Sequence, residues 1–208
     1  MTTKRTAVLL DGGFVVKRLY HLLKKSHPTA DQVYEFAKKC VEADEELFRI
    51  YYYDCYPYGE VERHPLSGQA INFATSATFA RHKTLLDALA TKDHVALREG
   101  VLSFDGWEIT REATTELIKK QRPIVAADVR PDMKQKRVDM KIGLDVAWLA
   151  SKGLVQRIVM ATADSDFVPA MKFARREGVQ VVLVPMGTKL LKRDLIVHAD
   201  IVRSVTYP

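Results

Sequence analysis

Short apolar runs that alternate with helical stretches constrain the fold of this chain more than any other feature of its sequence. The runs are of strand length and cover residues 6–10, 47–53, 157–162, 179–184 and 201–205. Between them, apolar side chains recur at helical spacing over residues 14–25, 30–44, 76–91, 138–152, 166–176 and 189–197. Strands that alternate with helices predict an α/β fold with a mostly parallel central sheet and helices on both faces.

The middle of the chain fits this pattern less well. Residues 54–75 are rich in proline and glycine and predict a long loop. The pair Asp105 and Gly106 separates two apolar stretches, 95–104 and 107–110, and predicts a β-hairpin turn. The basic, proline-bearing stretch 121–137 predicts another loop. We therefore expect a single domain over residues 1–208, with a loop and hairpin elaboration at about 55–135.

Charge and hydropathy narrow the setting of the protein. The formal net charge is +6, from 32 Lys and Arg against 26 Asp and Glu, and this moderate excess is compatible with a polyanionic partner. Every apolar run is far too short to cross a bilayer, and no small-residue cleavage site follows the first one. We expect a cytoplasmic protein without a membrane partner. The basic residues form two clusters, which are Lys134, Lys136, Arg137 and Lys141, and Lys189, Lys192 and Arg193.

Aspartates follow the ends of two predicted strands. Asp11 comes directly after the first strand, and Asp164 and Asp166 come after the strand 157–162. Asp139 opens the helix that follows the basic stretch. Because ligands of parallel α/β sheets bind beyond the carboxyl ends of the strands, we expect these four side chains to converge there. Carboxylates brought together repel one another, and Mg²⁺ or Mn²⁺ would remove that cost, since these ions prefer oxygen ligands.

Each aspartate also has a simpler interpretation. Asp11, which precedes two glycines, could be a turn residue. Asp164 or Ser165 could cap the next helix, and Asp139 would gain from the helix dipole. Asp145 lies six positions beyond Asp139, about 240° further around the helix, and is expected to be a supporting or buried structural residue. Turn and cap roles explain each aspartate singly, but not why acids fall at two strand ends and one helix start.

Three stretches of the chain resemble the signature blocks of a known family. They are Ala7-Val8-Leu9-Leu10-Asp11-Gly12, Val138-Asp139-Met140-Lys141-Ile142-Gly143-Leu144-Asp145 and Thr162-Ala163-Asp164-Ser165-Asp166-Phe167-Val168-Pro169. The family is the NYN domain, which belongs to the PIN-like nuclease superfamily and includes the LabA-like bacterial proteins. The stretch 195–200 resembles the end of that domain, so the resemblance spans most of the chain.

The resemblance implies a Rossmann-like PIN fold and metal-dependent cleavage of RNA. It implies that the catalytic and metal-binding residues are Asp11, Asp139, Asp164 and Asp166, with Mg²⁺ or Mn²⁺ as the cofactor and RNA as the partner. Two positions depart from the family pattern. Phe14 stands where Asn is common, and Ala163 stands where Gly is usual.

The first functional hypothesis is a ribonuclease in which a bound metal ion activates water for attack on a phosphodiester. The residues expected to support the site are Gly12, Asp145, Thr162 and Ser165, the last two by orienting carboxylates or water. The basic residues expected to contact RNA phosphates are Lys134, Lys136, Arg137 and Lys141. The tyrosines that could stack on unpaired bases, or else pack in the core, are Tyr51, Tyr52, Tyr53, Tyr56 and Tyr58.

Two other hypotheses stay open on the sequence alone. On the same fold the chain could be a non-catalytic module that binds RNA or protein, an interpretation that Phe14 favours. It could also be a metal-dependent phosphotransferase or phosphatase, although the usual Asp-x-Asp pair is missing because Gly13 follows Asp11 and Gly12. The sequence contains neither a phosphate-loop motif nor a three-glycine dinucleotide fingerprint. A homodimer formed through a sheet edge or a helix is compatible with the sequence.

Overall fold

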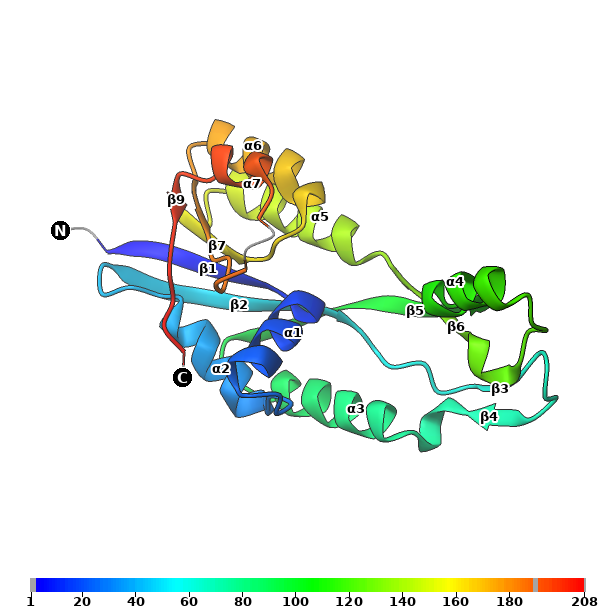
Figure 1. Cartoon of the computed structure of the whole chain (residues 1–208). Helices are drawn as coiled ribbons and strands as arrows, with labels where there is room; N and C mark the ends of the chain where they lie inside the picture. The colour runs from blue at the N-terminus through cyan, green and yellow to red at the C-terminus, as the bar shows by residue number, and fades with distance from the viewer. Residues whose placement is uncertain (1–2, 189–190, 208) are drawn as a thin grey trace. The chain divides into compact units, whose positions relative to one another are not determined.

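The strands of the protein were located in a computed structural model that describes residues 3–188 and 191–207 (Figure 1). Within these residues, seven strands hydrogen-bond in the order β6-β5-β2-β1-β7-β8-β9, and β3 and β4 form a separate pair. The chain divides into two compact units. We call Met1–Asp54, Leu85–Gly100 and Arg137–Pro208 the core unit, and Cys55–Thr84 and Val101–Lys136 the insert unit.

The core unit is built on parallel strands. β1 (Lys4–Asp11) lies between β2 (Glu45–Cys55) and β7 (Arg157–Ala161), and both neighbours run parallel to it. β8 (Gln180–Leu183) and β9 (Ile201–Val202) continue the parallel pairing from β7. The mostly parallel sheet that the sequence predicts is therefore confirmed, and it places the carboxyl ends of β1, β2 and β7 side by side.

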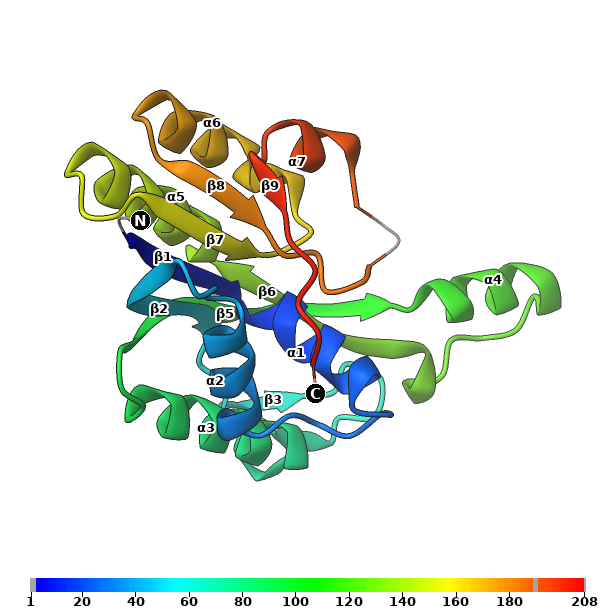
Figure 2. The ribbon, with the colours of Figure 1, turned by 90° about the vertical axis from the view of Figure 1, so that its left-hand side faces the viewer.

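Helices cover both faces of this sheet. Figure 2 shows α5 (Val138–Ser151) and α6 (Val168–Arg176) on one face, and α1 (Gly12–Leu22) and α2 (Ala30–Lys39) on the other. α3 (Ala77–Ala90) adds buried leucines from its last turns to the core, and α7 (Arg193–Val197) precedes β9. None of the helices that the structure describes combines the length and the apolar character that crossing a bilayer would need.

The start of α2 shows how the sequence fixes these helices. Thr29 and Gln32 form a capping box, in which each side chain accepts a hydrogen bond from the backbone N–H of the other residue. Val33 and Phe36 then follow at helical spacing and are fully buried. The helix ends at Lys39, five residues before the predicted end at 44, because residues 40–44 turn toward β2.

The insert unit corrects several sequence predictions. The hairpin predicted at Gly106 is wrong, since β5 (Val95–Ile109) runs through this position as one strand. Gly106 has φ +108°, and the register with β6 (Val129–Lys136) shifts between Phe104 and Trp107. The glycine thus serves a bulge in an antiparallel pair rather than a turn. The Asp-Gly signal identified a residue with positive φ, but not the structure around it.

The loops predicted for the insert unit also contain regular structure. β3 (Val61–Arg63) and β4 (Ala70–Asn72) pair within the predicted loop 54–75, and β6 occupies the second half of the predicted loop 121–137. α4 (Arg111–Lys120) was not predicted, because Ala113 is its one fully buried residue and gives no apolar stripe. Short 3₁₀ turns lie at Phe73–Thr75 and Ala126–Asp128.

Candidate active site

Asp11 occupies the point where β1 becomes α1. It is the last residue of the strand and the N-cap of the helix, and its Oδ1 accepts a hydrogen bond from the Phe14 N–H at 3.1 Å. Its Oδ2 accepts a second bond from the Thr162 hydroxyl, also at 3.1 Å. The simpler interpretation of Asp11 was a turn residue, and the structure makes it the N-cap of α1 with one oxygen directed at the end of β7.

A chain of hydrogen bonds links Asp11 to the other acids after β7. Thr162 is buried, and its hydroxyl accepts a bond from the Asp164 N–H at 3.1 Å while donating to Asp11. Asp164 in turn accepts from the Asp166 N–H at 2.9 Å and caps the 3₁₀ turn Ser165–Phe167 that leads into α6. Thr162 thus links the Asp11 carboxylate to the backbone of Asp164, which follows a different strand.

Asp139 approaches the same acids from another element. It lies in the first turn of α5, a helix that packs against the turn at Ser165–Phe167. Partial burial raises the pKa of Asp139, and the negative charges of Asp164 and Asp166 raise it further. The charge of Asp164 therefore acts on both Asp11 and Asp139, and the charge of Asp166 acts on Asp139.

Asp11 carries the most buried of these charges. Burial is the largest cause that raises the pKa of Asp11, since Leu9, Met160 and Phe167 line a void beside it. The hydrogen bonds from Phe14 and Thr162 lower this pKa, and the charges of Asp164 and Asp54 raise it. The pKa of Asp11 is raised overall, because its hydrogen bonds do not fully offset the cost of burying the charged carboxylate.

No lysine or arginine among the described residues forms an ion pair with these four aspartates. The set offers several carboxylate oxygens and a net repulsion, which is the chemistry that a hard divalent cation satisfies. The donor set therefore fits Mg²⁺ or Mn²⁺. The spacing is wider than in a closed cage, because no three of the four bring their oxygens within 4.8 Å of one another in the described structure.

A tighter acidic trio lies elsewhere. Within residues 3–188 and 191–207, the acids with oxygens all within 4.8 Å are Glu42, Asp44 and Glu45. Glu45, at the amino end of β2, is buried and ion-paired with Arg157 and Arg203. Hydrogen bonds from these two arginines lower the pKa of Glu45 against the effect of burial. The buried member of this trio, Glu45, is therefore held in a structural ion-pair network, while Glu42 and Asp44 are exposed.

Two further residues lie near Asp11. Asp54 was not among the predicted site residues, and Gly12 was predicted to support the site. Asp54 lies near the end of β2, is 4% exposed, and accepts a hydrogen bond from the Tyr52 hydroxyl at 3.3 Å. The strand-end rule applied to Asp11 could have found it, because Asp54 directly follows the predicted strand 47–53. A Cβ at Gly12 would lie 2.6 Å from Asp54 Oδ2 and 2.7 Å from the Tyr53 carbonyl oxygen, so this position requires glycine.

A lysine also reaches the acidic run. The Lys192 ammonium donates to the hydroxyl of Ser165 at 2.8 Å, and Ser165 lies between Asp164 and Asp166 in the chain. Ser165 is therefore an anchor for Lys192. Lys192 had been noted only as one member of a basic cluster, and another member, Lys189, lies outside the described residues.

The remaining predicted residues fall into different places. Asp145 accepts hydrogen bonds from Arg98 at 2.8 Å and from the Tyr53 hydroxyl at 2.9 Å, in agreement with the structural interpretation. Tyr51, Tyr52 and Tyr53 are 4%, 1% and 1% exposed. The stacking hypothesis is therefore wrong for these three tyrosines, and their packing interpretation is correct.

The expected RNA-contacting residues are divided between the two units. Arg137 is the N-cap residue of α5 and Lys141 lies within that helix, so both belong to the core unit. Lys134 and Lys136 belong to the insert unit, where both pair with Asp105. Hydrogen bonds from the Ser103 hydroxyl and then from these lysines lower the pKa of Asp105 to about 2.

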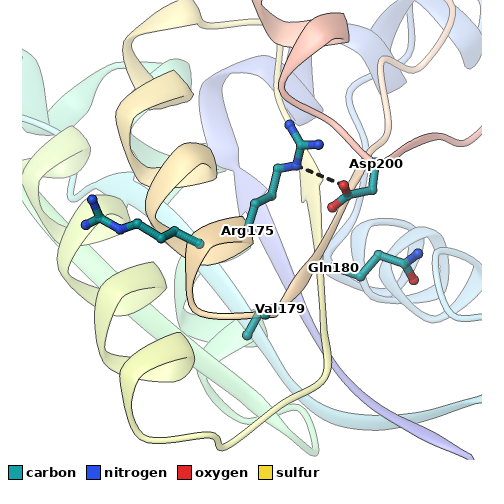
Figure 3. Close-up of a pocket in the computed structure, with 6 residues that line it drawn as sticks. Arg175, Val179, Gln180 and Asp200 are labelled. Carbon is teal, nitrogen blue, oxygen red and sulfur yellow. Dashed lines mark hydrogen bonds and ion pairs between the residues drawn. The ribbon is translucent and has the colours of Figure 1, made fainter.

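An open cavity of about 480 Å³ lies away from the aspartates. It surrounds the turn between α6 and the first residue of β8, and Figure 3 shows Arg175 paired with Asp200 in it. Asp200 also accepts from the Val181 N–H at 2.8 Å. This pairing joins the α6–β8 turn to the segment before β9, and we regard it as structural.

Comparisons with known proteins agree with this geometry. The model of the NYN domain family matches residues 5–205 and confirms the resemblance seen in the three sequence blocks. The structure is similar to the crystal structure of a protein of unknown function, VPA0982 from Vibrio parahaemolyticus. The TM-score is 0.52 and the identity 16%, over 99% of this chain and 94% of that chain, so this likeness supports the fold. No curated protein matches the chain.

Proposed function

Because the chain belongs to the NYN domain family, a family of PIN-like nucleases, we propose that it is a metal-dependent ribonuclease. The proposed reaction is hydrolysis of an RNA phosphodiester. The observation that carries the proposal is the hydrogen-bonded series from Asp11 through Thr162 to Asp164, with Asp139 facing the same acids and no basic partner for any of them in the described structure.

Mg²⁺ or Mn²⁺ would be held by Asp11, Asp139, Asp164 and Asp166. When bound, such an ion lowers the pKa of water and stabilises charge on phosphate oxygens. Asp11 and Asp139 must lose their protons to act as ligands, and their raised pKa values make that step sensitive to pH. Thr162 is a positioning residue, because it holds the Asp11 carboxylate toward the end of β7.

The basic residues of the core unit would bind the RNA backbone. Lys192 is held beside the acidic run by Ser165, and we assign it a phosphate of the bound strand. Arg137 and Lys141, at the start of α5, would contact further phosphates on the side of Asp139. Lys134 and Lys136 of the insert unit would add to the attraction for RNA, although Asp105 neutralises part of their charge.

Two observations favour a second candidate function, which is RNA binding without cleavage. No three of the four aspartates bring their oxygens within 4.8 Å of one another in the described structure. In addition, Phe14 replaces a polar residue of the family pattern. The Phe14 side chain packs against the hydrophobic core, so this position contributes only its backbone N–H to Asp11.

The test is cleavage of a pool of cellular RNAs by the purified chain, in Mn²⁺ and in chelator. We expect cleavage that requires Mn²⁺, and we expect Asp164→Asn to abolish it. A thermal unfolding transition like that of the parent would show that the variant is folded. The matched control is Asp145→Asn, which removes a charge from the Arg98 pair and should leave a measurable rate. Binding of RNA without cleavage in Mn²⁺ would establish the second candidate, and cleavage by Asp164→Asn at the full rate would exclude this site.

A further inference from the structure

The insert unit contains a pocket that the proposed reaction does not use. Its volume is about 360 Å³, within the range of ligand-binding pockets. Its lining includes Pro57, Tyr58, Phe73, Thr78, Phe79 and Met133. All of them belong to the insert unit, so the pocket is formed within that unit alone.

The aromatic side chains of this unit are not packed away. Among its described residues, the buried apolar side chains are Cys55, Pro57 and Ala113. Tyr58, Phe73, Phe79, Phe104 and Trp107 are only partly buried. A domain that needed these rings for its core would bury them. Three of these rings, Tyr58, Phe73 and Phe79, line the pocket and offer an apolar surface to a ligand.

Contacts between the rings hold that surface in place. Tyr58 lies near parallel to Phe104, with centroids 6.0 Å apart, and meets Phe73 edge-on at 5.6 Å. Phe79 meets Tyr56 edge-on at 6.4 Å, and a Cβ at Gly59 would lie 2.9 Å from Phe79 Cε2. The Phe79 ring therefore has backbone against one side and is fixed before any ligand binds.

Among the described residues, a positive charge without a carboxylate partner contacts the pocket residue Thr78. Arg81 is one turn beyond Thr78 on α3, and its guanidinium lies 3.5 Å from the Thr78 hydroxyl. Arg81 forms no ion pair with any residue of the described chain. A ligand that fills the pocket and also satisfies Arg81 must join a flat ring to an anion.

We propose that this pocket binds an unpaired nucleobase of an RNA strand, with the ring stacked on the aromatic surface and a neighbouring phosphate at Arg81. Bases stack on aromatic side chains irrespective of sequence, and a phosphate is the natural partner of a free guanidinium. The proposal rests on RNA being the substrate of the core unit. It assigns the insert unit the role of holding an unpaired stretch of that substrate.

The test measures binding of a short unstructured RNA to the full chain in chelator, so that no strand is cut. Phe79→Ala removes the ring on which a base would stack, so its affinity for the RNA should be about tenfold weaker than that of the parent. Phe79→Tyr keeps an aromatic ring and should bind the RNA as the parent does. The matched control is Phe173→Ala, which removes a partly exposed ring from α6 in the core unit. A second probe is a strand of the same length that has sugar and phosphate but no bases.

We expect Phe79→Ala and the parent to bind the base-free strand with equal affinity. The parent should bind RNA about tenfold more tightly than Phe79→Ala does. Equal RNA affinity of Phe79→Ala and the parent, or no measurable RNA binding by the parent, would overturn the proposal. Manganese-dependent cleavage and its loss in Asp164→Asn are scored separately. An unchanged RNA affinity of Phe79→Ala would therefore not contradict the proposed ribonuclease. The ribonuclease proposal is tested by the cleavage assay, which does not depend on the Phe79 variants.

Discussion

Replacing Thr162 by valine tests the link between the two strand ends. The substitution keeps the branched shape of a side chain that is 2% exposed, but removes the hydroxyl. Asp11 Oδ2 then loses its donor, and the Asp164 N–H loses its acceptor. Asp164 is exposed, so its N–H can turn to water, whereas Asp11 is largely buried.

The expected magnitude follows from these two bonds. A hydrogen bond to a charged group contributes about 1.5–3 kcal/mol, and the backbone bond is largely replaced by water. We expect the free energy of unfolding to fall by about 2–3 kcal/mol, which lowers Tm by about 4–12 °C for a chain of this length. Loss of a partner that orients a metal ligand typically weakens metal affinity by about 10–100-fold.

The assay is a calorimetric titration of Mn²⁺ at several pH values, with thermal unfolding as the measure of stability. The matched control is Thr6→Val, because Thr6 is also buried and its hydroxyl donates to the Lys4 carbonyl at 3.1 Å. Thr6→Val should lower Tm but leave Mn²⁺ affinity unchanged. In Thr162→Val the pKa of Asp11 rises further, so Mn²⁺ binding should also fail at a higher pH than in the parent.

The result that refutes this reasoning is a Thr162→Val variant with parental Mn²⁺ affinity and parental pH dependence. Such a variant would behave as Thr6→Val does, with a lower Tm and no effect at the aspartates. The hydrogen bond between Thr162 and Asp11 would then be a structural contact that the metal does not sense.

Three further predictions concern stability. In the metal-free chain, Asp11 and Asp139 have folded-state pKa values above their unfolded values, so the folded state binds more protons and stability falls as pH rises through that window; Asp11→Asn should flatten this part of a urea-unfolding profile. Gly12→Ala should cost at least about 2 kcal/mol because its Cβ meets backbone and carboxylate, whereas Gly143→Ala, in open space on α5, should stabilise by up to about 1 kcal/mol, as urea midpoints will report. Glu45→Gln should cost about 3–5 kcal/mol in the same assay by leaving two buried guanidinium groups without their carboxylate.

The architecture of the core unit was readable from local patterns. The buried strands end at Asp11 and after Ala161, and apolar residues at helical spacing mark α5 and α6. Parallel strands separated by helices leave few arrangements, so Asp11 and Asp164 could be placed at one edge before any coordinates were known. The part played by Thr162 as a bridge between them depends on register, which a sequence pattern does not give.

The insert unit was harder to predict because its structure depends on pairing rather than on apolar periodicity. β6 carries mostly polar side chains and reads as a loop, but it is held by backbone bonds to β5. Gly106 supplies positive φ for a bulge where a turn was expected. Lys192 was visible only as part of a basic cluster, because its bond to Ser165 joins segments 27 residues apart.

We propose that the divalent ion binds at Asp11 and the acids after β7, and not at the tighter acidic trio that contains Glu45. Calorimetric titration of Mn²⁺ into the parent, Asp11→Asn and Asp44→Asn separates the two sites in one experiment. We predict that Asp44→Asn binds Mn²⁺ as the parent does and that Asp11→Asn loses this binding while remaining folded. Binding that survives in Asp11→Asn and disappears in Asp44→Asn would contradict the account.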